Sequence, residues 1–92
     1  MEIVFSSQAL KDAEFWKKSG NEEVQTKIAA FLESIKQTPF SGIGKPEPLK
    51  GNLSGFWSRR ITKEDRVVYT VVYKVQESFI SVLSLKGHYE KL

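Results

Sequence analysis

Hydrophobic residues follow two different spacings along the chain, and the change of spacing divides it into expected elements. Residues 2–5 are rich in β-branched and aromatic side chains, which favours a strand. The run stops at Ser6 and Ser7, which are both good N-cap residues for a helix. Apolar residues then recur at helical spacing until Gly20, which can supply a left-handed C-cap. The inward face of this first helix is expected to hold Ala9, Ala13 and Trp16, with Leu10 beside them.

A second helix is predicted between Asn21 and Thr38. Asn21 can cap its first turn, where Glu22 and Glu23 are favourable because the N-terminus of a helix attracts negative charge. Pro39 ends it, since the residue before a proline avoids helical geometry. A stripe of apolar residues at helical spacing marks its buried face: Val24, Ile28, Phe31, Leu32 and Ile35.

The segment from Pro39 to Gly55 holds all three prolines and four of the six glycines, which predicts a structured loop. Functional residues concentrate on such loops. Near its centre, Pro46 and Pro48 flank Glu47 and restrict the backbone to an extended conformation, so the carboxylate is expected to have a well-defined position. The alternative is a solvated glutamate in a connector that the prolines merely stiffen.

Three strand-like runs follow, over residues 56–61, 67–73 and 79–85. The connections between them are short, which predicts antiparallel hairpins. The middle run places Val67, Tyr69 and Val71 on one face and further apolar residues on the other, so it should be the central strand. The order of elements indicates an α+β fold: an N-terminal strand, two helices, and three antiparallel strands that complete one sheet with the helices on one face.

Composition narrows the class of protein. A chain of 92 residues with 40% hydrophobic and 27% charged residues is expected to form a single domain over residues 1–92. No apolar run approaches the roughly 20 residues of a membrane helix, and no signal-peptide pattern follows Met1, so no membrane association and a cytoplasmic location are expected. The chain has no cysteine and one histidine, so neither a metal site nor a cofactor is expected. A net charge of +3 is compatible with a phosphate-bearing or acidic partner.

The three arginines lie close together in the sequence, at Arg59, Arg60 and Arg66. Arginine offers a planar, permanently charged fork that suits phosphate. Neighbouring residues of a strand point to opposite faces, so only one of Arg59 and Arg60 can share the face of Arg66. The alternative is a set of surface arginines in weak ion pairs with Glu64 or Asp65.

His88 and Tyr89 follow the last strand-like run. Together with a carboxylate and a guanidinium, they complete a set suited to metal-free cleavage of RNA through its own 2′-hydroxyl, with a base, a charge stabiliser and an acid. The alternative is an exposed, inert histidine near the C-terminus.

These residues resemble a known family. The run TPFxGxGKPEPLKxNLSGFWSRRI at positions 38–61, the following Arg66-x-Val68-Tyr69 and the His88-Tyr89 pair closely resemble the YoeB/Txe toxins of the RelE superfamily. The resemblance spans the whole chain and is densest between residues 38 and 69. The ending at residues 86–89 looks more like the Txe branch.

The resemblance implies a small toxin of a type II toxin-antitoxin system that cleaves mRNA in the A site of the 30S ribosomal subunit. By motif position, Glu47 matches the general base, Arg66 the stabiliser of the transition state, His88 the acid, and Tyr89 a tyrosine that orients substrate. The implied products are a 2′,3′-cyclic phosphate and a 5′-hydroxyl, without a metal. Positive residues expected to contact RNA phosphate are Lys45, Lys50, Arg59 and Arg60.

The resemblance also implies partners. A cognate antitoxin is expected to hold the toxin inactive, and the basic site predicts that it is acidic. Family members often form homodimers, and the composition leaves that point open here. Two departures from the family pattern are the tail Glu90-Lys91-Leu92 after the His-Tyr pair and a longer hairpin through residues 74–78.

Two other functions compete with the enzyme. A non-catalytic RNA- or DNA-binding accessory module would use the cations only to neutralise phosphate. A structural interaction protein would use the exposed loop only to dock a partner chain. Glu47 and His88 favour the enzyme, because a purely electrostatic binder gains nothing from a carboxylate beside its phosphate site.

Overall fold

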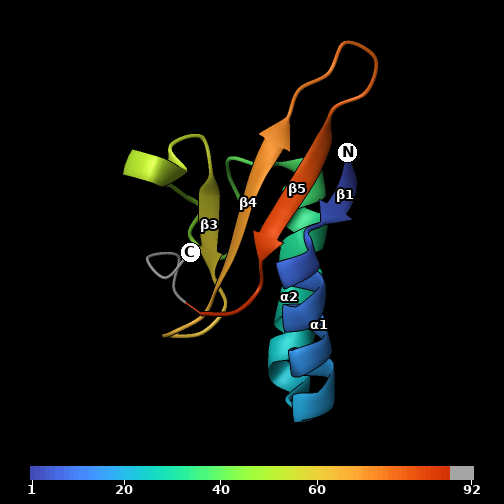
Figure 1. Ribbon diagram of the computed structural model, residues 1–92. Coiled ribbons are helices and arrows are strands. Elements are labelled where there is room, and N and C mark those ends of the chain that lie inside the picture. The colour runs from blue at the N-terminus through green and yellow to red at the C-terminus, as the bar shows by residue number, and fades with distance from the viewer. Residues whose placement is uncertain (88–92) are drawn as a thin grey trace.

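The computed structural model describes residues 1–87, and Figure 1 shows its elements in chain order. His88 and Tyr89 lie outside the described residues. The helices and strands are β1 (Glu2–Phe5), α1 (Ser7–Ser19), α2 (Glu22–Gln37), β2 (Glu47–Pro48), a 3₁₀ turn (Gly51–Leu53), β3 (Trp57–Arg60), β4 (Arg66–Val72) and β5 (Phe79–Ser84).

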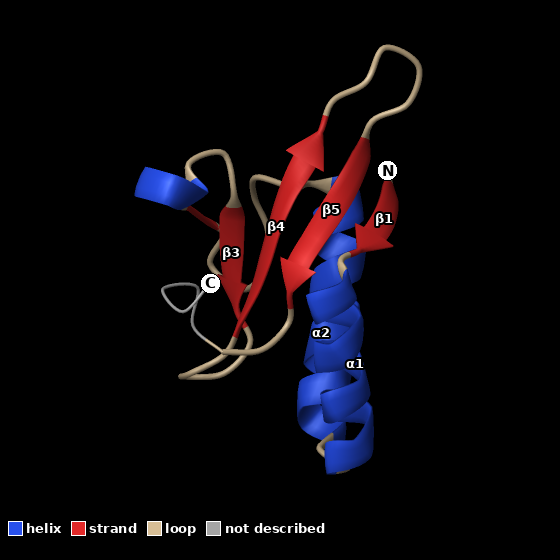
Figure 2. Ribbon diagram, in the orientation of Figure 1, coloured by secondary structure: helices blue, strands red, loops and turns tan. Residues whose placement is uncertain are grey.

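The strands form one sheet in the order β1-β5-β4-β3-β2, with β4 at its centre (Figure 2). β1 runs parallel to β5, and the other neighbours are antiparallel. The predicted α+β fold and central strand are thereby confirmed. The sequence did not predict β2, a two-residue strand inside the proline-rich loop. It lies at the sheet edge, where a proline costs no ladder hydrogen bond.

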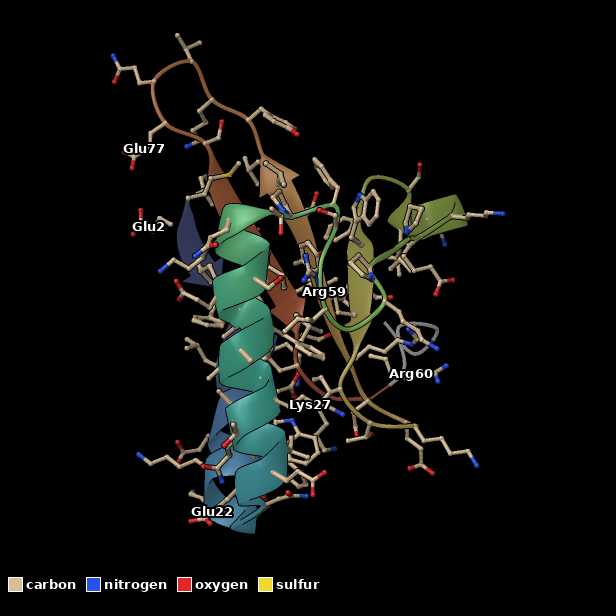
Figure 3. All side chains as sticks on the ribbon, turned by 180° about the vertical axis from the view of Figure 1, so that it is seen from behind. Glu2, Glu22, Lys27, Arg59, Arg60 and Glu77 are labelled. Carbon is tan, nitrogen blue, oxygen red and sulfur yellow. The ribbon has the colours of Figure 1, made fainter. Side chains whose placement is uncertain are left out.

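The predicted helix boundaries are confirmed by their caps. The Ser6 side chain accepts the backbone N–H of Ala9 at 3.0 Å, and the Asn21 side chain accepts that of Val24 at 3.1 Å. Gly20 ends α1 with φ 73°, the left-handed conformation that glycine adopts without strain. The two helices lie side by side on one face of the sheet (Figures 1 and 3). Within residues 1–87, no helix is long and apolar enough to cross a membrane.

The inward face of α1 differs from the prediction. Ala9 and Trp16 are buried, but Ala13 is exposed and so is Leu10. Asp12 takes the inward position instead, with 6% exposure. Its carboxylate accepts a hydrogen bond from the backbone N–H of Leu85, the residue after β5. The polar side chain is buried because it satisfies that buried donor.

The main core lies between the helices and the sheet. The predicted stripe of α2 is confirmed, with Leu32 only partly buried. The strands contribute alternate residues of β4 and β5, as expected for a sheet with one face against helices. The buried cluster comprises Ala9, Trp16, Val24, Ile28, Phe31, Ile35, Ile61, Val67, Tyr69, Val71, Ile80, Val82 and Leu85.

Candidate functional site

Glu47 and Arg66 are brought together by two strand pairings. Glu47 on β2 pairs with Ser58 on β3, and β3 pairs with the start of β4, where Arg66 lies. Arg66 Nη1 is 3.9 Å from Glu47 Oε2 and 3.4 Å from the Ser58 hydroxyl oxygen, to which it donates. The Arg66 side chain is 13% exposed and that of Glu47 is 56% exposed. The site therefore combines a solvent-facing carboxylate with a guanidinium that is largely withdrawn from water.

The loop that carries Glu47 is fixed by backbone hydrogen bonds on both sides of it. Leu49 is buried and donates its N–H to Phe56 O at 2.9 Å, and Arg60 donates its N–H to Gly44 O at 2.9 Å. A Cβ at Gly44 would lie 2.8 Å from the Phe31 ring, so the loop rests directly on α2. These contacts hold Glu47 in a defined place beside the sheet.

Arg60 shares the face of Arg66. The two residues are direct partners in the β3–β4 register, and Arg60 is exposed, directed away from the helices in Figure 3. Lys45 and Lys50 are also exposed, two residues before and three residues after Glu47. Of the non-glycine residues in the described part of the chain, Lys45 alone has positive φ, at 53°. Three of the four predicted cations are thus available to a polyanion.

Arg59 is not available, and its predicted contact with phosphate is wrong. It has 0% exposure and lies between α2 and β3 (Figure 3). Strand alternation, which the sequence already showed, sends it to the opposite face from Arg66. Its guanidinium donates to five acceptors: Tyr69 Oη at 3.1 Å, Ser34 Oγ at 2.7 Å, and the carbonyls of Ile43 at 3.1 Å, Thr38 at 2.7 Å and Ser41 at 2.8 Å.

These acceptors assign Arg59 a structural role. Ser34 lies near the end of α2, Tyr69 lies on β4, and the other three acceptors lie between α2 and Glu47, so one side chain joins helix, loop and sheet. Burial raises the pKa of the Tyr69 phenol, and the hydrogen bond and charge of Arg59 oppose that shift. Tyr69 in turn donates its hydroxyl to Pro39 O at the start of the loop. The site's geometry therefore depends on a buried polar network.

Ser58 is a site residue that the sequence did not reveal. It is fully buried, it pairs with Glu47, and its hydroxyl accepts from Arg66. Its position two residues before Arg60 on one strand, and hence on the same face, is the signal that would have found it.

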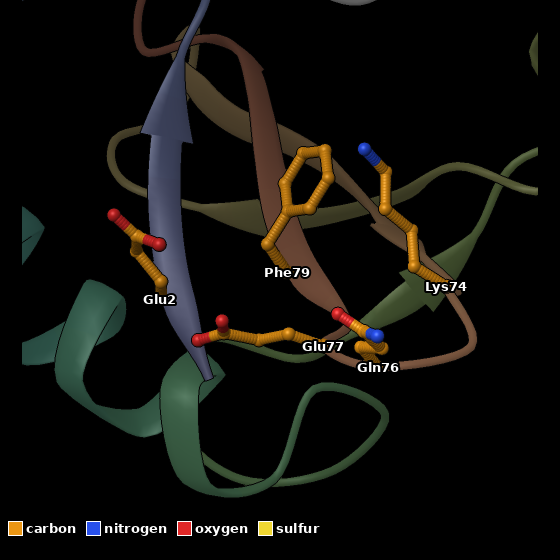
Figure 4. Close-up of a pocket in the computed structure, with 5 residues that line it drawn as sticks. All are labelled: Glu2, Lys74, Gln76, Glu77 and Phe79. Atoms are coloured by element: carbon orange, nitrogen blue, oxygen red, sulfur yellow. The ribbon is translucent and has the colours of Figure 1, made fainter.

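The described residues also form a hollow of about 410 Å³, but at the other end of β4 (Figure 4). Glu2, Lys74, Gln76, Glu77 and Phe79 line it. Lys74 lies two residues beyond the last residue of β4, Val72, whereas Arg66 is the first residue of that strand. A strand of seven residues separates them by about 20 Å, so the hollow is distinct from the Glu47–Arg66 site.

Comparison with known proteins defines the class: this fold is that of toxins from bacterial type II toxin-antitoxin systems. Residues 5–89 match the family described as YoeB-like toxin of bacterial type II toxin-antitoxin system. The chain therefore belongs to the YoeB-like toxins, as its sequence indicated.

Individual relatives agree over nearly the whole chain. Toxin YoeB of Escherichia coli K12 is 39% identical over 89 residues, which cover 97% of this chain and 100% of that protein. The solved YoeB/ParE toxin from Agrobacterium tumefaciens has a TM-score of 0.89 at 42% identity, covering 97% of this chain and 100% of that one. Two Staphylococcus aureus structures cover 97% of this chain and 98% of theirs: a YoeB dimer (TM-score 0.81, 41% identity) and a YoeB-YefM complex (TM-score 0.80, 42% identity).

Proposed function

We propose that this toxin is an endoribonuclease that cleaves mRNA in the A site of the 30S ribosomal subunit and so stops translation. The observation that carries the proposal is the exposed Glu47 carboxylate 3.9 Å from Arg66 Nη1 on one face of the sheet. A general base beside a permanent positive charge is the pair that attack by a ribose hydroxyl on its own phosphate requires.

In the proposed reaction, Glu47 takes the proton from the 2′-hydroxyl of the substrate. The 2′-oxygen forms a bond to the adjacent phosphorus, and the bond from phosphorus to the 5′-oxygen breaks. Arg66 stabilises the extra negative charge on the phosphate oxygens, and His88 donates a proton to the leaving oxygen. The products are a 2′,3′-cyclic phosphate and a 5′-hydroxyl, and no metal ion takes part.

The surroundings of the pair support these roles. The separation of 3.9 Å exceeds that of a hydrogen bond, so the Glu47 carboxylate keeps its lone pairs for a proton. Arg66 is largely withdrawn from water, where a positive charge stabilises a developing negative charge more strongly. Its backbone N–H donates to Gly87 O at 3.1 Å, which ties the residue before His88 to the start of β4. Tyr89, the next residue, is proposed to orient the substrate.

In this proposal, the ribosome aligns the RNA for attack, which the small basic surface of the toxin cannot do alone. Arg60, Lys45 and Lys50 are exposed and can neutralise phosphates around the scissile bond. Three cations are too few to hold a flexible RNA strand in line for attack, so alignment of the substrate falls to the decoding centre.

Partners follow from the same surface. The S. aureus YoeB has been solved in complex with YefM. We propose that this toxin also binds an antitoxin, and that this antitoxin is acidic and covers the basic site. Since S. aureus YoeB also forms a dimer, a homodimer of this chain is proposed as well. The site of action would be the cytoplasm, where ribosomes translate.

The test uses ribosomes programmed with a defined mRNA. The toxin should cut at the A-site codon and leave 5′-hydroxyl ends, which a polynucleotide kinase labels without prior phosphatase treatment. A 2′-deoxy substitution at the nucleotide whose hydroxyl attacks should abolish the cut. Glu47→Gln should lower the single-turnover rate by about a hundredfold or more, while Glu33→Gln on the exposed face of α2 should not.

Two results would count against this function. Cleavage of the 2′-deoxy message at the normal rate would exclude attack by the 2′-oxygen. A wild-type toxin that blocked translation without any RNA cleavage would favour the non-catalytic RNA-binding module.

A further inference from the structure

The segment between β5 and His88 is attached to the rest of the protein at alternate residues. At the first point, Leu85 donates its N–H to Asp12 Oδ2 at 2.9 Å, and its carbonyl accepts Trp16 Nε1–H at 2.8 Å. Both backbone groups of Leu85 are thus held by α1. Leu85 itself is buried, so this first point belongs to the core.

The second point is Gly87, whose partners lie at the start of β4 instead of on α1. Gly87 donates its N–H to Asp65 Oδ1 at 2.8 Å, and its carbonyl accepts the N–H of Arg66 at 3.1 Å. The β4–β5 ladder ends earlier, at the pair Val68 and Ser84. Gly87 therefore lies beyond regular strand pairing, and the Asp65 carboxylate accepts its backbone N–H.

The Asp65 carboxylate is itself held in place by the turn between β3 and β4. Its Oδ2 accepts the Thr62 hydroxyl at 2.7 Å. Thr62 Oγ1 in turn accepts the N–H of Asp65 at 3.0 Å and that of Glu64 at 3.1 Å. Because Oδ2 is held by Thr62 in the turn, the carboxylate is oriented so that Oδ1 accepts from Gly87.

We propose that Asp65 is a positioning residue for the leaving-group acid. By holding the Gly87 N–H, it fixes where the chain enters His88, one bond further on, next to the proposed transition-state stabiliser Arg66. This inference rests on the proposed RNA cleavage and adds a residue to it. Asp65 does not contact RNA in this role; it acts through the backbone.

The physical reason is the conformational freedom of glycine. Gly87 has φ 79°, and a glycine loses more conformational entropy on ordering than any other residue. A hydrogen bond to an ionised carboxylate is stronger than one between neutral groups, so Asp65 can offset that cost where a backbone bond alone would do so poorly. Without it, the position of Gly87, the residue before His88, would depend on the backbone hydrogen bond from Arg66.

A purely structural role for Asp65 in the turn is the rival explanation, and three variants separate the two. Asp65→Ala removes both carboxylate contacts. Thr62→Ala removes the turn contacts but leaves Asp65 Oδ1 able to accept from Gly87. Asp65→Asn keeps an acceptor for Gly87 and can donate to Thr62 Oγ1, but it lacks the charge, so it should rescue in part. Glu64→Ala removes the same charge from the same turn and is the matched control.

Each variant is measured in two ways. The first is amide hydrogen exchange at Gly87 by NMR, which needs no substrate. The second is single-turnover cleavage on programmed ribosomes at saturating and sub-saturating ribosome concentrations. Asp65→Ala should speed Gly87 exchange and slow cleavage at saturation, each by about ten- to hundredfold, the size of one charge-assisted hydrogen bond. The ribosome concentration giving half-maximal rate should stay unchanged. Thr62→Ala should cost much less, and Asp65→Asn should recover only part of the loss because its neutral amide oxygen is a weaker acceptor. Glu64→Ala should stay near wild type.

Several outcomes would overturn the inference. Equal losses in Asp65→Ala and Thr62→Ala would make Asp65 a turn residue only. Faster exchange at Gly87 with an unchanged cleavage rate would show that the anchor does not serve catalysis. If the wild-type toxin cut no RNA, the proposed function would fail by itself, and the positioning role would fall with it even where exchange at Gly87 confirmed the tether.

Discussion

Arg59 on β3 and Tyr69 on β4 form a buried pair in which Arg59 Nε–H donates to the Tyr69 hydroxyl oxygen at 3.1 Å. The guanidinium carbon lies 5.8 Å from the centre of the tyrosine ring. The remaining guanidinium donors reach carbonyls and a hydroxyl on α2 and the following loop, and Tyr69 reaches the same loop through Pro39. The loop that carries Glu47 is thus held in place by the guanidinium of Arg59, a charged group that is fully buried.

We expect Arg59→Met to be strongly destabilising. The substitution would leave several partly buried acceptors without their donor, at up to about 1–3 kcal/mol each, and should lower the melting temperature by more than 10 °C. Arg59→Lys should rescue little, because an ammonium cannot reproduce the planar fork. The control is Arg60→Met, an exposed neighbour that should change stability by less than about 0.5 kcal/mol. Thermal unfolding followed by circular dichroism would decide, and equal shifts for both arginines would contradict the network.

Tyr69 should make stability depend on pH in the alkaline range. Burial raises its pKa above the ordinary 10.0, against the opposing effect of Arg59. Below pH 10 the phenol is protonated in both folded and unfolded chains. As the pH rises further, the unfolded chain loses this proton first, so the free energy of unfolding falls. Melting temperatures between pH 8 and pH 11 should therefore decline more steeply for wild type than for Tyr69→Phe. Tyr73→Phe, at an exposed position, controls for loss of a phenol, and parallel curves for wild type and Tyr69→Phe would refute the effect.

Gly44 should tolerate alanine worse than Gly51 does. Both have positive φ, at 83° and 64°, so alanine is strained by about 1 kcal/mol at either position. At Gly44 the added Cβ would also lie 2.8 Å from the Phe31 ring and 3.1 Å from Arg59 Cβ, whereas at Gly51 it meets nothing within 4 Å. Gly44→Ala should thus lose more stability, and it should also slow cleavage because the loop carries Glu47. Denaturant unfolding of the two variants measures the difference, which should vanish only if the loop does not pack on Phe31.

Local signals in the sequence predicted most of the fold. Ser6, Gly20 and Asn21 act as caps through contacts with their own neighbours, so residue type and position suffice to find them. The central position of β4 follows from its apolar residues on both faces. The buried face of α1 was predicted incorrectly because Asp12 is buried. Its carboxylate accepts a hydrogen bond from the backbone N–H of Leu85, which is distant in the sequence, and the spacing of apolar residues gives no sign of such a contact.

The site was predictable only in part, for the same reason. Residue type identified Glu47 and Arg66, but their proximity depends on the pairing of β2 with β3, which the prolines concealed. Arg59 was grouped with the phosphate contacts because its partners are mostly backbone carbonyls. Every residue has a carbonyl, so the sequence does not show which carbonyls accept from an arginine. Asp65 was considered only in the alternative reading, in which Glu64 or Asp65 forms weak ion pairs with the arginines, whereas its carboxylate contacts Thr62 and Gly87.

Arg66→Lys should separate charge from geometry at the proposed catalytic site. The lysine keeps the positive charge but loses the planar fork of the guanidinium. In the wild type, Arg66 Nη1 lies near both the Ser58 hydroxyl and Glu47, and the side chain is 13% exposed. A single ammonium cannot bridge two phosphate oxygens as charge develops on them, so the single-turnover rate on programmed ribosomes should fall by about a hundredfold. Arg60→Lys is the matched control, since its register partner is Arg66 itself and its side chain is exposed. It should keep nearly the full rate, because charge alone suffices for an outer phosphate contact. A rate that fell equally in both variants would remove the distinction between Arg66 as stabiliser and Arg60 as a phosphate contact.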